Sequence, residues 1–414
     1  MIVSFAYLNG GTDMNYEKGA ELMMDALKGF HGRFKLLYGQ MALRLDDETY
    51  LLSGGNKLLA GAGDEDFAVC DIRTGGLGEL FGMRPDIDAI LFGVTKDMVA
   101  VSERGVPLRT TLVDIAEITG SELRISPDAS PENISEALEG STVCLIKGMG
   151  GLACGSNLKK AVAGIQIIEK ACEAESHGVL LGGTVPLDAD YAESCRDFFQ
   201  SDYVHRNEKE KIPFVGFDEE EFSLRVRLIE AGKDLVKKDL TYGSWGSLSV
   251  RYGADEMLIT PSAMDYFEIR PEDIVRMNIN ELIFGEQRVP SGESAMHAAV
   301  YRQLPDCEAF IHVHSNALSV FSACEAGFAS GDPDLKELIG DVLVTANGRP
   351  VTPEVAVSVA ETMTKTHAAV IPHHGAVFTG PSVETAVSIA EAVELRARSI
   401  LDFDSDIVAE EDSE

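Results

Sequence analysis

The sequence predicts an α/β protein made of two copies of one fold, each a layered α/β/α domain with a central, mainly antiparallel sheet flanked by helices. Two observations support this prediction. Short apolar segments of strand length alternate with longer segments of helical period along the 414-residue chain. The order and spacing of these segments recur in the two halves, and a chain of this length is expected to form two or three domains.

The repeat is visible as pairs of similar segments that follow one another in the same order. Each pair is only weakly similar residue by residue, so order and spacing carry the prediction. The pairs, first copy against second, are Asp86–Leu91 and Asp306–Ile311, Ser102 and Ser322, Gly150–Gly155 and Gly375–Gly380, the helices Leu158 to about Ala174 and Val383 to about Leu401, and, more loosely, Tyr38-Gly39 and Tyr242-Gly243.

The boundary between the copies is expected in the polar, charged stretch from Gln200 to Glu221. We therefore predict a first domain at residues 1–205, a linker at 206–221 and a second domain at 222–414. The last residues, from Asp402 to Glu414, carry seven acidic and no basic side chains. They are expected to form a solvated tail.

The second copy carries clear signals for its helices and strands. Apolar residues at helical spacing predict an opening helix, and Ser291 is expected to cap a later one. The expected elements are a helix through Phe222, Val226, Ile229 and Val236, strands Ser247–Tyr252 and Met257–Thr260, a helix from Gly292 to Leu304, the strand that holds His312 and His314, and strands Ala368–Ile371 and Ala376–Thr379.

Histidines are concentrated in this second copy, where six of the nine fall between His297 and His374. Because side chains at i and i+2 of a strand point to the same face, His312 and His314 would project together. A metal ion is the leading reason for two imidazoles on one strand face. His374, in a tight turn before a glycine, could add a third nitrogen, whereas His297 is expected to pair with Glu293 on a helix surface and is not counted as a ligand.

Composition excludes several classes of function. A net charge of −33 would repel nucleic acid and anionic membranes. No apolar run reaches the ~18 residues of a membrane span, and the first residues lack the pattern of a signal peptide. Seven scattered cysteines without a Cys-x-x-Cys pair favour reduced thiols. We therefore expect a cytoplasmic protein that acts on a small molecule.

The second copy, from about Phe222 to Leu401, resembles the class II aldolase/adducin family, and within it the fuculose-phosphate aldolases. In that family the metal ligands are the glutamate of a Pro-Ser-x-Glu motif, both histidines of His-x-His, and the histidine before a glycine. The resemblance therefore implies that Glu293, His312, His314 and His374 bind Zn²⁺ or another divalent metal. The motifs that carry it are Gly243–Arg251, Met257–Ser262, Pro290–Glu293, His312–His314 and His373–Gly375.

The resemblance implies an aldolase-type lyase that cleaves or forms a carbon–carbon bond in a small hydroxylated carbonyl compound, a sugar or a sugar phosphate. The metal would stabilise an enediolate, and Glu293 would leave the metal and move a proton as the catalytic base. Epimerisation or dehydration at the same zinc site is the alternative within enzymes. An adducin-like scaffold without chemistry is the alternative outside them.

A phosphate-binding site is also implied by the resemblance, because hydroxyls and backbone N–H groups can bind anions without a cation. Two departures from the family pattern leave a substrate without phosphate open: Ser247 replaces an asparagine, and Ala263 replaces a glycine. The residues expected to bind substrate or phosphate are Ser244, Gly246, Ser247, Ser262, Ser291 and Gly292.

The general acid cannot be assigned, because the fuculose-phosphate aldolases use a tyrosine after the His-x-His motif and this chain has none after Tyr301. The first copy has Phe92, Val94 and Met149 opposite the three histidines, and the glutamate position falls near Gly76. We therefore predict that the first copy binds no zinc. The resemblance also implies a homo-oligomer, because members of that family typically form fourfold rings. Two chains could then form a ring of four domains in which the first copy lines the second copy's cleft and donates the missing acid.

Overall fold

The computed structural model describes residues 14–27, 38–54, 66–74, 76–201, 216–285, 288–349 and 352–402. The chain divides into two compact units. Most of the predicted linker, and all of the predicted acidic tail after Asp402, lie outside the described residues. Unit 1 takes in residues 1–110, 115–176 and 188–196, and unit 2 takes in 111–114, 177–187 and 197–414.

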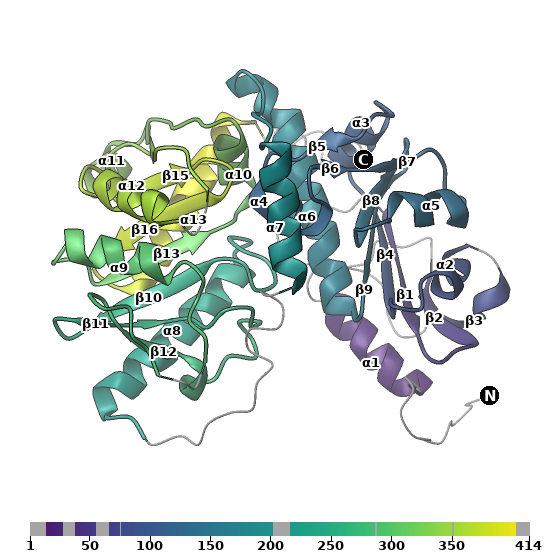
Figure 1. The fold of residues 1–414 in the computed structure, drawn as a ribbon, viewed down its shortest axis with the longest axis horizontal. Helices are drawn as coiled ribbons and strands as arrows, with labels where there is room; N and C mark the ends of the chain where they lie inside the picture. Colours follow the sequence, from purple (N-terminus) through teal and green to yellow (C-terminus); the bar gives the residue numbers. More distant parts are fainter. Residues whose placement is uncertain are drawn as a thin grey trace, which may run out of the picture. The chain divides into compact units, whose positions relative to one another are not determined.

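Unit 2 is built on a seven-stranded sheet in the order β12-β11-β10-β13-β16-β15-β14, in which all neighbours are antiparallel except β14 and β15 (Figure 1). This arrangement confirms the predicted α/β class with a mainly antiparallel sheet. The strands are β10 Ser247–Tyr252, β11 Glu256–Ile259, β12 Val275–Asn278, β13 Ala309–Val313, β14 Leu343–Val344, β15 Ala368–Ile371 and β16 Gly375–Gly380.

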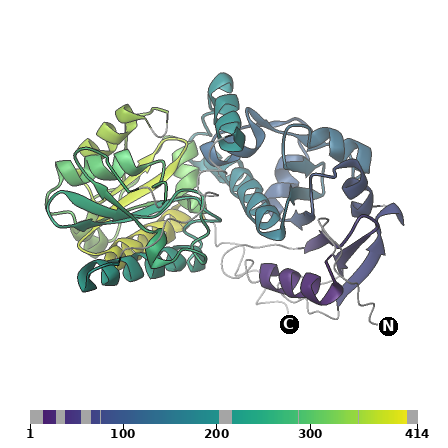
Figure 2. The same ribbon diagram turned by 60° about the horizontal axis from the view of Figure 1, so that its bottom comes forward.

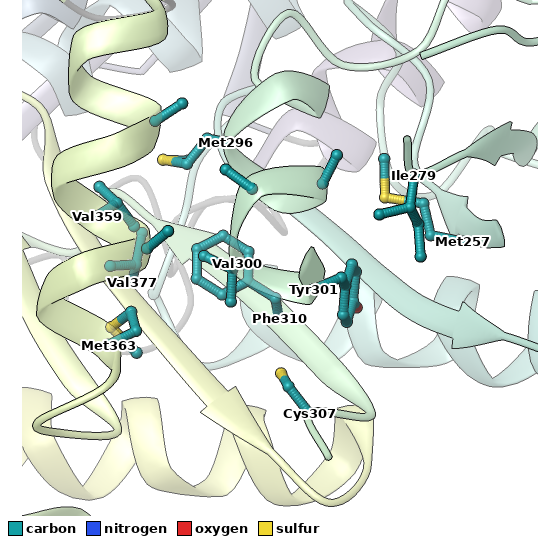
Figure 3. Close-up of a cluster of buried hydrophobic side chains, with 14 of the residues drawn as sticks. Met257, Ile279, Met296, Val300, Tyr301, Cys307, Phe310, Val359, Met363 and Val377 are labelled. Atoms are coloured by element: carbon teal, nitrogen blue, oxygen red, sulfur yellow. The ribbon is translucent and has the colours of Figure 1, made fainter. Parts of the chain in front are cut away.

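Helices cover both faces of this sheet (Figure 2). On one face α9 and α12 pack together over apolar side chains such as Phe310 and Val377 (Figure 3). On the other face α13 packs against α8, α10 and β16. The helices are α8 Glu219–Lys237, α9 Ser294–Gln303, α10 Asn316–Ala323, α11 Pro333–Ile339, α12 Pro353–Met363 and α13 Val383–Ile400, with a 3-10 turn η7 at Pro271–Asp273.

Helix α9 begins later than the sequence predicts. Its N-cap residue is Glu293, and the helix starts at Ser294 rather than Gly292. Ser291 is therefore not the cap, although its hydroxyl accepts a hydrogen bond from the Glu293 N–H at 3.3 Å. The change matters because it places the Glu293 side chain at the junction of loop and helix.

Unit 1 repeats the sheet of unit 2 with the order β3-β2-β1-β4-β9-β8-β7, again with one parallel pair at the edge. A small second sheet pairs β5 with β6. The strands are β1 Tyr38–Arg44, β2 Thr49–Ser53, β3 Phe67–Asp71, β4 Ala89–Val94, β5 Leu108–Arg109, β6 Glu122–Leu123, β7 Ile125–Ser126, β8 Val143–Ile146 and β9 Gly150–Gly155. The helices of this part of the chain are α1 Tyr16–Leu27, η4 Ile72–Thr74, α2 Leu77–Met83, α3 Lys96–Ser102, α4 Val113–Thr119, α5 Pro131–Ala137, α6 Leu158–His177, η5 Gly178–Leu181 and α7 Ala189–Ser201.

The strand registers confirm the repeat at single-residue level. Phe92 of β4 lies opposite Leu152 of β9, as His312 of β13 lies opposite Val377 of β16. Ile146 pairs with Gly150, as Ile371 pairs with Gly375, so Met149 corresponds to His374. The predicted alignment of the first copy against the three histidines is therefore right in this region.

One predicted pair is wrong. Gln40 lies opposite Phe92 and Ser247 lies opposite His312, so Gln40 corresponds to Ser247. Tyr38-Gly39 then corresponds to Trp245-Gly246 and not to Tyr242-Gly243. The Tyr-Gly pair at 242 lies in the loop before β10, where a shared dipeptide says nothing about register.

Among the described residues, no helix is both long and apolar enough to span a bilayer.

Candidate metal centre

His312 and His314 lie at the end of β13, between β10 and β16 in the middle of the sheet. The two rings are on the same side, as the two-residue period of a strand requires, with their centroids 4.5 Å apart. Both side chains are buried. The His312 Nδ1–H donates to the carbonyl of Ala376 at 3.1 Å, which leaves Nε2 as the lone-pair nitrogen of the neutral ring.

His374 joins them from the turn between β15 and β16. Its N–H donates to the Ser322 hydroxyl at 2.8 Å, and the residue before it, His373, has a positive φ of 62°. A left-handed residue with a Cβ is uncommon, and here it forms the sharp turn that aims the next ring inward. The three imidazoles of His312, His314 and His374 offer nitrogens that all lie within 4.8 Å of one another.

Glu293 reaches the same point from the start of α9. Its Oε1 lies 3.4 Å from His312 Nε2 and 3.3 Å from His374 Nε2. Its Oε2 accepts a hydrogen bond from the Ser247 hydroxyl at 2.9 Å. The structure thus brings together the four predicted ligands from three separate elements.

The donor set fits a divalent cation. Glu293 Oε1 and His312 Nε2 are both buried, and neither has a hydrogen-bond partner in the structure. Buried polar atoms are normally satisfied, because leaving one without a partner costs free energy. A carboxylate oxygen and three imidazoles are ligands that zinc prefers, so a cation at this point would satisfy both atoms.

Sequence reasoning missed Asp114, which the structure places in unit 2 with the rest of the segment Thr111–Asp114. Its Oδ2 lies 3.4 Å from His314 Nδ1, and both side chains are buried. The segment is tied to His373, whose Nδ1–H donates to the Thr111 carbonyl at 2.9 Å and whose carbonyl accepts the Val113 N–H at 2.8 Å. A carboxylate beside a ligating imidazole orients the ring.

The prediction that His297 pairs on a helix surface is wrong, because its side chain is fully buried. Its Nε2 lies 2.8 Å from the Ser247 hydroxyl and its Nδ1 lies 2.7 Å from the Ser249 hydroxyl. Burial lowers the pKa of His297 well below its ordinary value, so the ring is neutral. Glu293 and His297 do lie on one face of the helix, four residues apart, but that face packs against the sheet.

The residues predicted to bind substrate or phosphate fall into two groups. Ser247 is fully buried and its hydroxyl is directed at Glu293, so it contacts the metal centre rather than a loop. Gly246 has a φ of 80°, and a Cβ there would lie 2.7 Å from the His312 carbonyl, so this position requires glycine. Ser244 lies in the same loop, partly exposed.

The loops of Ser262 and Ser291 are held together by a bridge between Pro261 and Pro290. Ala263, which the sequence marked as a departure from a glycine, has a φ of 54° and therefore occupies a conformation that disfavours a side chain. Gly292 lines a small pocket next to the centre, together with Glu293, Ala295, Met296, Thr352, Val355, Ala356 and His374.

Both repeats are similar in sequence to known proteins of one family. The sequence profile described as "Class II Aldolase and Adducin N-terminal domain" matches residues 27–176 and 226–401. The chain is 27% identical to 5-deoxy-D-ribulose 1-phosphate aldolase of Bacillus thuringiensis serovar kurstaki over 42% of this chain and 82% of that protein. It is 31% identical to methylthioribulose-1-phosphate dehydratase of Methylococcus capsulatus over 42% of this chain and 91% of that protein. Among solved structures, an L-fuculose 1-phosphate aldolase aligns with 33% identity over 46% of this chain and 88% of that chain, with a TM-score of 0.41.

Proposed function

The chain belongs to the class II aldolase and adducin family in both of its repeats, and from this premise we propose that its second repeat is a metal-dependent lyase. The proposed reaction cleaves or forms a carbon–carbon bond in a small hydroxylated carbonyl compound, a sugar or a sugar phosphate. The observation that carries the proposal is the convergence of Glu293 on His312 and His374, with His314 beside them.

Glu293, His312, His314 and His374 are the residues that would hold the metal, which we take to be Zn²⁺ or another divalent ion. When bound, such an ion supplies positive charge to a substrate oxygen and so favours the loss of a proton or a carbon fragment from the neighbouring carbon. His312 presents Nε2 because its other nitrogen is held by the Ala376 carbonyl. Glu293 is the one carboxylate of this ligand set, so it is our candidate for the base that moves the proton.

The substrate class is supported by the relatives, whose names specify sugar phosphates. We propose that Ser244, Gly246, Ser262, Ser291 and Gly292 bind the substrate, and that backbone N–H groups of their loops contribute to anion binding. Ser247 is assigned instead to Glu293, because its hydroxyl is buried against that carboxylate.

A dehydratase acting at the same centre is the second candidate, favoured by the similarity to methylthioribulose-1-phosphate dehydratase. An epimerase remains a third possible outcome of the same proton transfer. A scaffold without chemistry would not need buried ligand atoms left without hydrogen-bond partners, so we do not favour it.

Two further proposals concern the whole chain. We propose a cytoplasmic protein with reduced thiols, because none of the seven cysteines, all of which the structure describes, forms a disulfide. We also propose a homo-oligomer, in which two chains form a ring of four class II aldolase-like domains. Light scattering tests the second point, and a stable, active monomer would overturn it.

Metal analysis tests the proposed centre. Protein purified without chelator is expected to hold about one zinc per chain. The double variant His312→Ala/His314→Ala should lose it, whereas His367→Ala, which changes an exposed histidine bonded to Thr379, should keep it. Folded wild-type protein that takes up no divalent metal would rule out the proposal.

A substrate screen tests the reaction. The zinc-loaded protein is offered small hydroxy-carbonyl compounds with and without phosphate, and the products are identified by mass. Two carbonyl fragments indicate an aldolase, loss of water indicates a dehydratase, and an unchanged mass with inverted configuration indicates an epimerase. Turnover that persists in His312→Ala/His314→Ala would show that the chemistry lies elsewhere.

A further inference from the structure

A chain of four hydrogen bonds leads from the core of unit 2 to Glu293. The Tyr301 hydroxyl lies 2.8 Å from the Ser249 hydroxyl, which lies 2.7 Å from His297 Nδ1. His297 Nε2 lies 2.8 Å from the Ser247 hydroxyl, which donates to Glu293 Oε2 at 2.9 Å. Of these five groups, only Glu293 and His297 were expected to pair, and the proposed function uses only Glu293 and Ser247.

This series of hydrogen bonds depends on two residue spacings, one in strand β10 and one in helix α9. Ser247 and Ser249 are two residues apart on β10 and therefore point to the same face of the sheet. Glu293, His297 and Tyr301 are four residues apart at the start of and along α9, which covers that face. The two serine hydroxyls thus fall alternately between the three helical side chains.

The four side chains that connect to Glu293 in this series are buried. Ser247, Ser249 and His297 are 0% exposed and Tyr301 is 1% exposed. Figure 3 shows Tyr301 inside the apolar cluster, where Val300 and Phe310 lie nearby. The His297 ring meets Phe310 edge-on with centroids 4.7 Å apart. Side chains packed in this way have a single available position, so the hydrogen bonds keep fixed partners.

The hydrogen bonds can be assigned one direction. A carboxylate only accepts, so Ser247 donates to Glu293 Oε2 and accepts from His297 Nε2–H. A neutral imidazole carries one N–H, so Nδ1 accepts from Ser249, and Ser249 accepts from the Tyr301 hydroxyl. The Ser249 hydroxyl also lies 3.4 Å from the Phe310 carbonyl, a longer contact than those with His297 and Tyr301.

We propose that Ser249, His297 and Tyr301 are positioning residues that hold the Ser247 O–H on Glu293 Oε2, so that Oε1 alone faces the metal and the substrate. The inference rests on the proposed function, since it concerns the same carboxylate. With Oε2 held by the Ser247 hydroxyl, Glu293 would offer a single oxygen, Oε1, to a cation or to a substrate proton. Without these hydrogen bonds, either carboxylate oxygen of Glu293 could turn toward the cation.

The first repeat lacks every link. The sheet registers place Gln40 and Ala42 at the positions of Ser247 and Ser249. The C-cap residues of α2 and α9, Arg84 and Leu304, each lie five residues before the next strand. Counting back from them places Leu77 and Phe81 at the positions of His297 and Tyr301. The repeat without ligand side chains also has no hydrogen-bonded chain behind them.

The test measures metal binding in matched variants of the full chain. Ser249→Ala removes the donor to His297, and His297→Leu removes both nitrogens. His297→Gln keeps an amide N–H that can reach Ser247. Thr379→Val is the control, since it removes a buried hydroxyl 2.7 Å from the Nδ1 of His367, the same kind of contact away from Glu293. Zinc affinity is measured by chelator competition, and Co²⁺ is used as a spectroscopic probe.

Ser249→Ala and His297→Leu are expected to weaken zinc binding about tenfold or more and to change the visible spectrum of bound Co²⁺, as loss of an outer partner of a ligand does. His297→Gln should recover part of the affinity and the spectrum. Thr379→Val should leave both as in the wild type. If His297→Leu does not fold, Ser249→Ala and His297→Gln decide the matter.

The outcomes separate this inference from the function on which it rests. Wild-type protein that binds zinc, with Ser249→Ala and His297→Leu equal to it in affinity and spectrum, overturns the inference and leaves the proposed function intact. A loss that is matched by Thr379→Val also overturns it, because a general loss of packing would then explain the effect. Wild-type protein that binds neither ion overturns both.

Discussion

The two repeats of this chain share a sheet order and a register but differ in what the sheet presents at one point. In the central strand, β13 of the second repeat has His312 where β4 of the first has Phe92. In the turn before the last strand, the second repeat has His374 where the first has Met149. The corresponding helix has 7 residues and the N-cap Gly76 in the first repeat, whereas it has 10 residues and the N-cap Glu293 in the second. The fold therefore does not require the histidines, and they point to a function of the second repeat alone.

Shared features show which residues serve the fold. The turn before the last strand is held by a serine hydroxyl in both repeats, Ser102 on the Gly148 N–H and Ser322 on the His374 N–H. The left-handed residue of that turn is Gly148 in the first repeat and His373 in the second. Glycine is the low-cost choice there, so the second repeat carries at His373 a backbone strain that the first repeat avoids.

The largest expected effect separates the repeats directly. His374→Ala should abolish zinc binding and lower kcat/KM by about a thousandfold or more, because it removes a metal ligand. Met149→Ala changes the corresponding, exposed residue of the first repeat and should leave zinc content and turnover unchanged. Metal content and steady-state rates of both variants check this. Equal losses in the two variants would contradict the division of roles.

Glu293→Gln is expected to reduce kcat about 10²- to 10⁴-fold, the range for removal of a general base. The amide keeps the size of the carboxylate but cannot accept the substrate proton. Rates are measured at saturating zinc, so that weaker metal binding is not counted as lost catalysis. A kcat near that of the wild type under those conditions would show that another group moves the proton.

Zinc should stabilise one repeat and not the other. At a free concentration about 100 times its Kd, a ligand adds about 2.7 kcal/mol to the stability of the unit that binds it. For a domain of this size that corresponds to a rise in Tm of about 5–10 °C. Calorimetry should show one shifted transition, and His374→Ala should lose the shift. A zinc-dependent transition that survives in His374→Ala would place a metal elsewhere in the chain.

Much of the fold was predictable because periodicity and turn residues are local. The alternation Phe310-Ile311-His312-Val313 predicted the strand and two imidazoles on one of its faces, and Gly375 marked the turn that carries His374. Glu293 followed only from the family motif, since its helix begins one residue after it and not before. The short parallel strands β7 and β14 were not expected, because two-residue strands leave no pattern.

What the sequence did not reveal depends on contacts between distant segments. The four-residue spacing of Glu293 and His297 identified a shared helix face but not whether that face met water or the sheet. The serines at 247 and 249 were the missing signal, because two hydroxyls on an inward strand face need partners. Asp114 gave no local signal at all, and only the folded chain places it beside His314.

The smallest effect concerns Asp114, and the repeat provides its control. Asp114→Asn should weaken zinc binding about tenfold, because the amide orients His314 less strongly than a carboxylate does. Helix α11 corresponds to α4, and Asp334 is the second residue of α11 as Asp114 is of α4. Because Asp334 is exposed, Asp334→Asn should bind zinc as the wild type does. Chelator competition measures both. If Asp114→Asn binds zinc as tightly as the wild type, the contact between Asp114 and His314 does not contribute to metal binding. The second repeat would then need no carboxylate from the segment Thr111–Asp114 to orient its ligands.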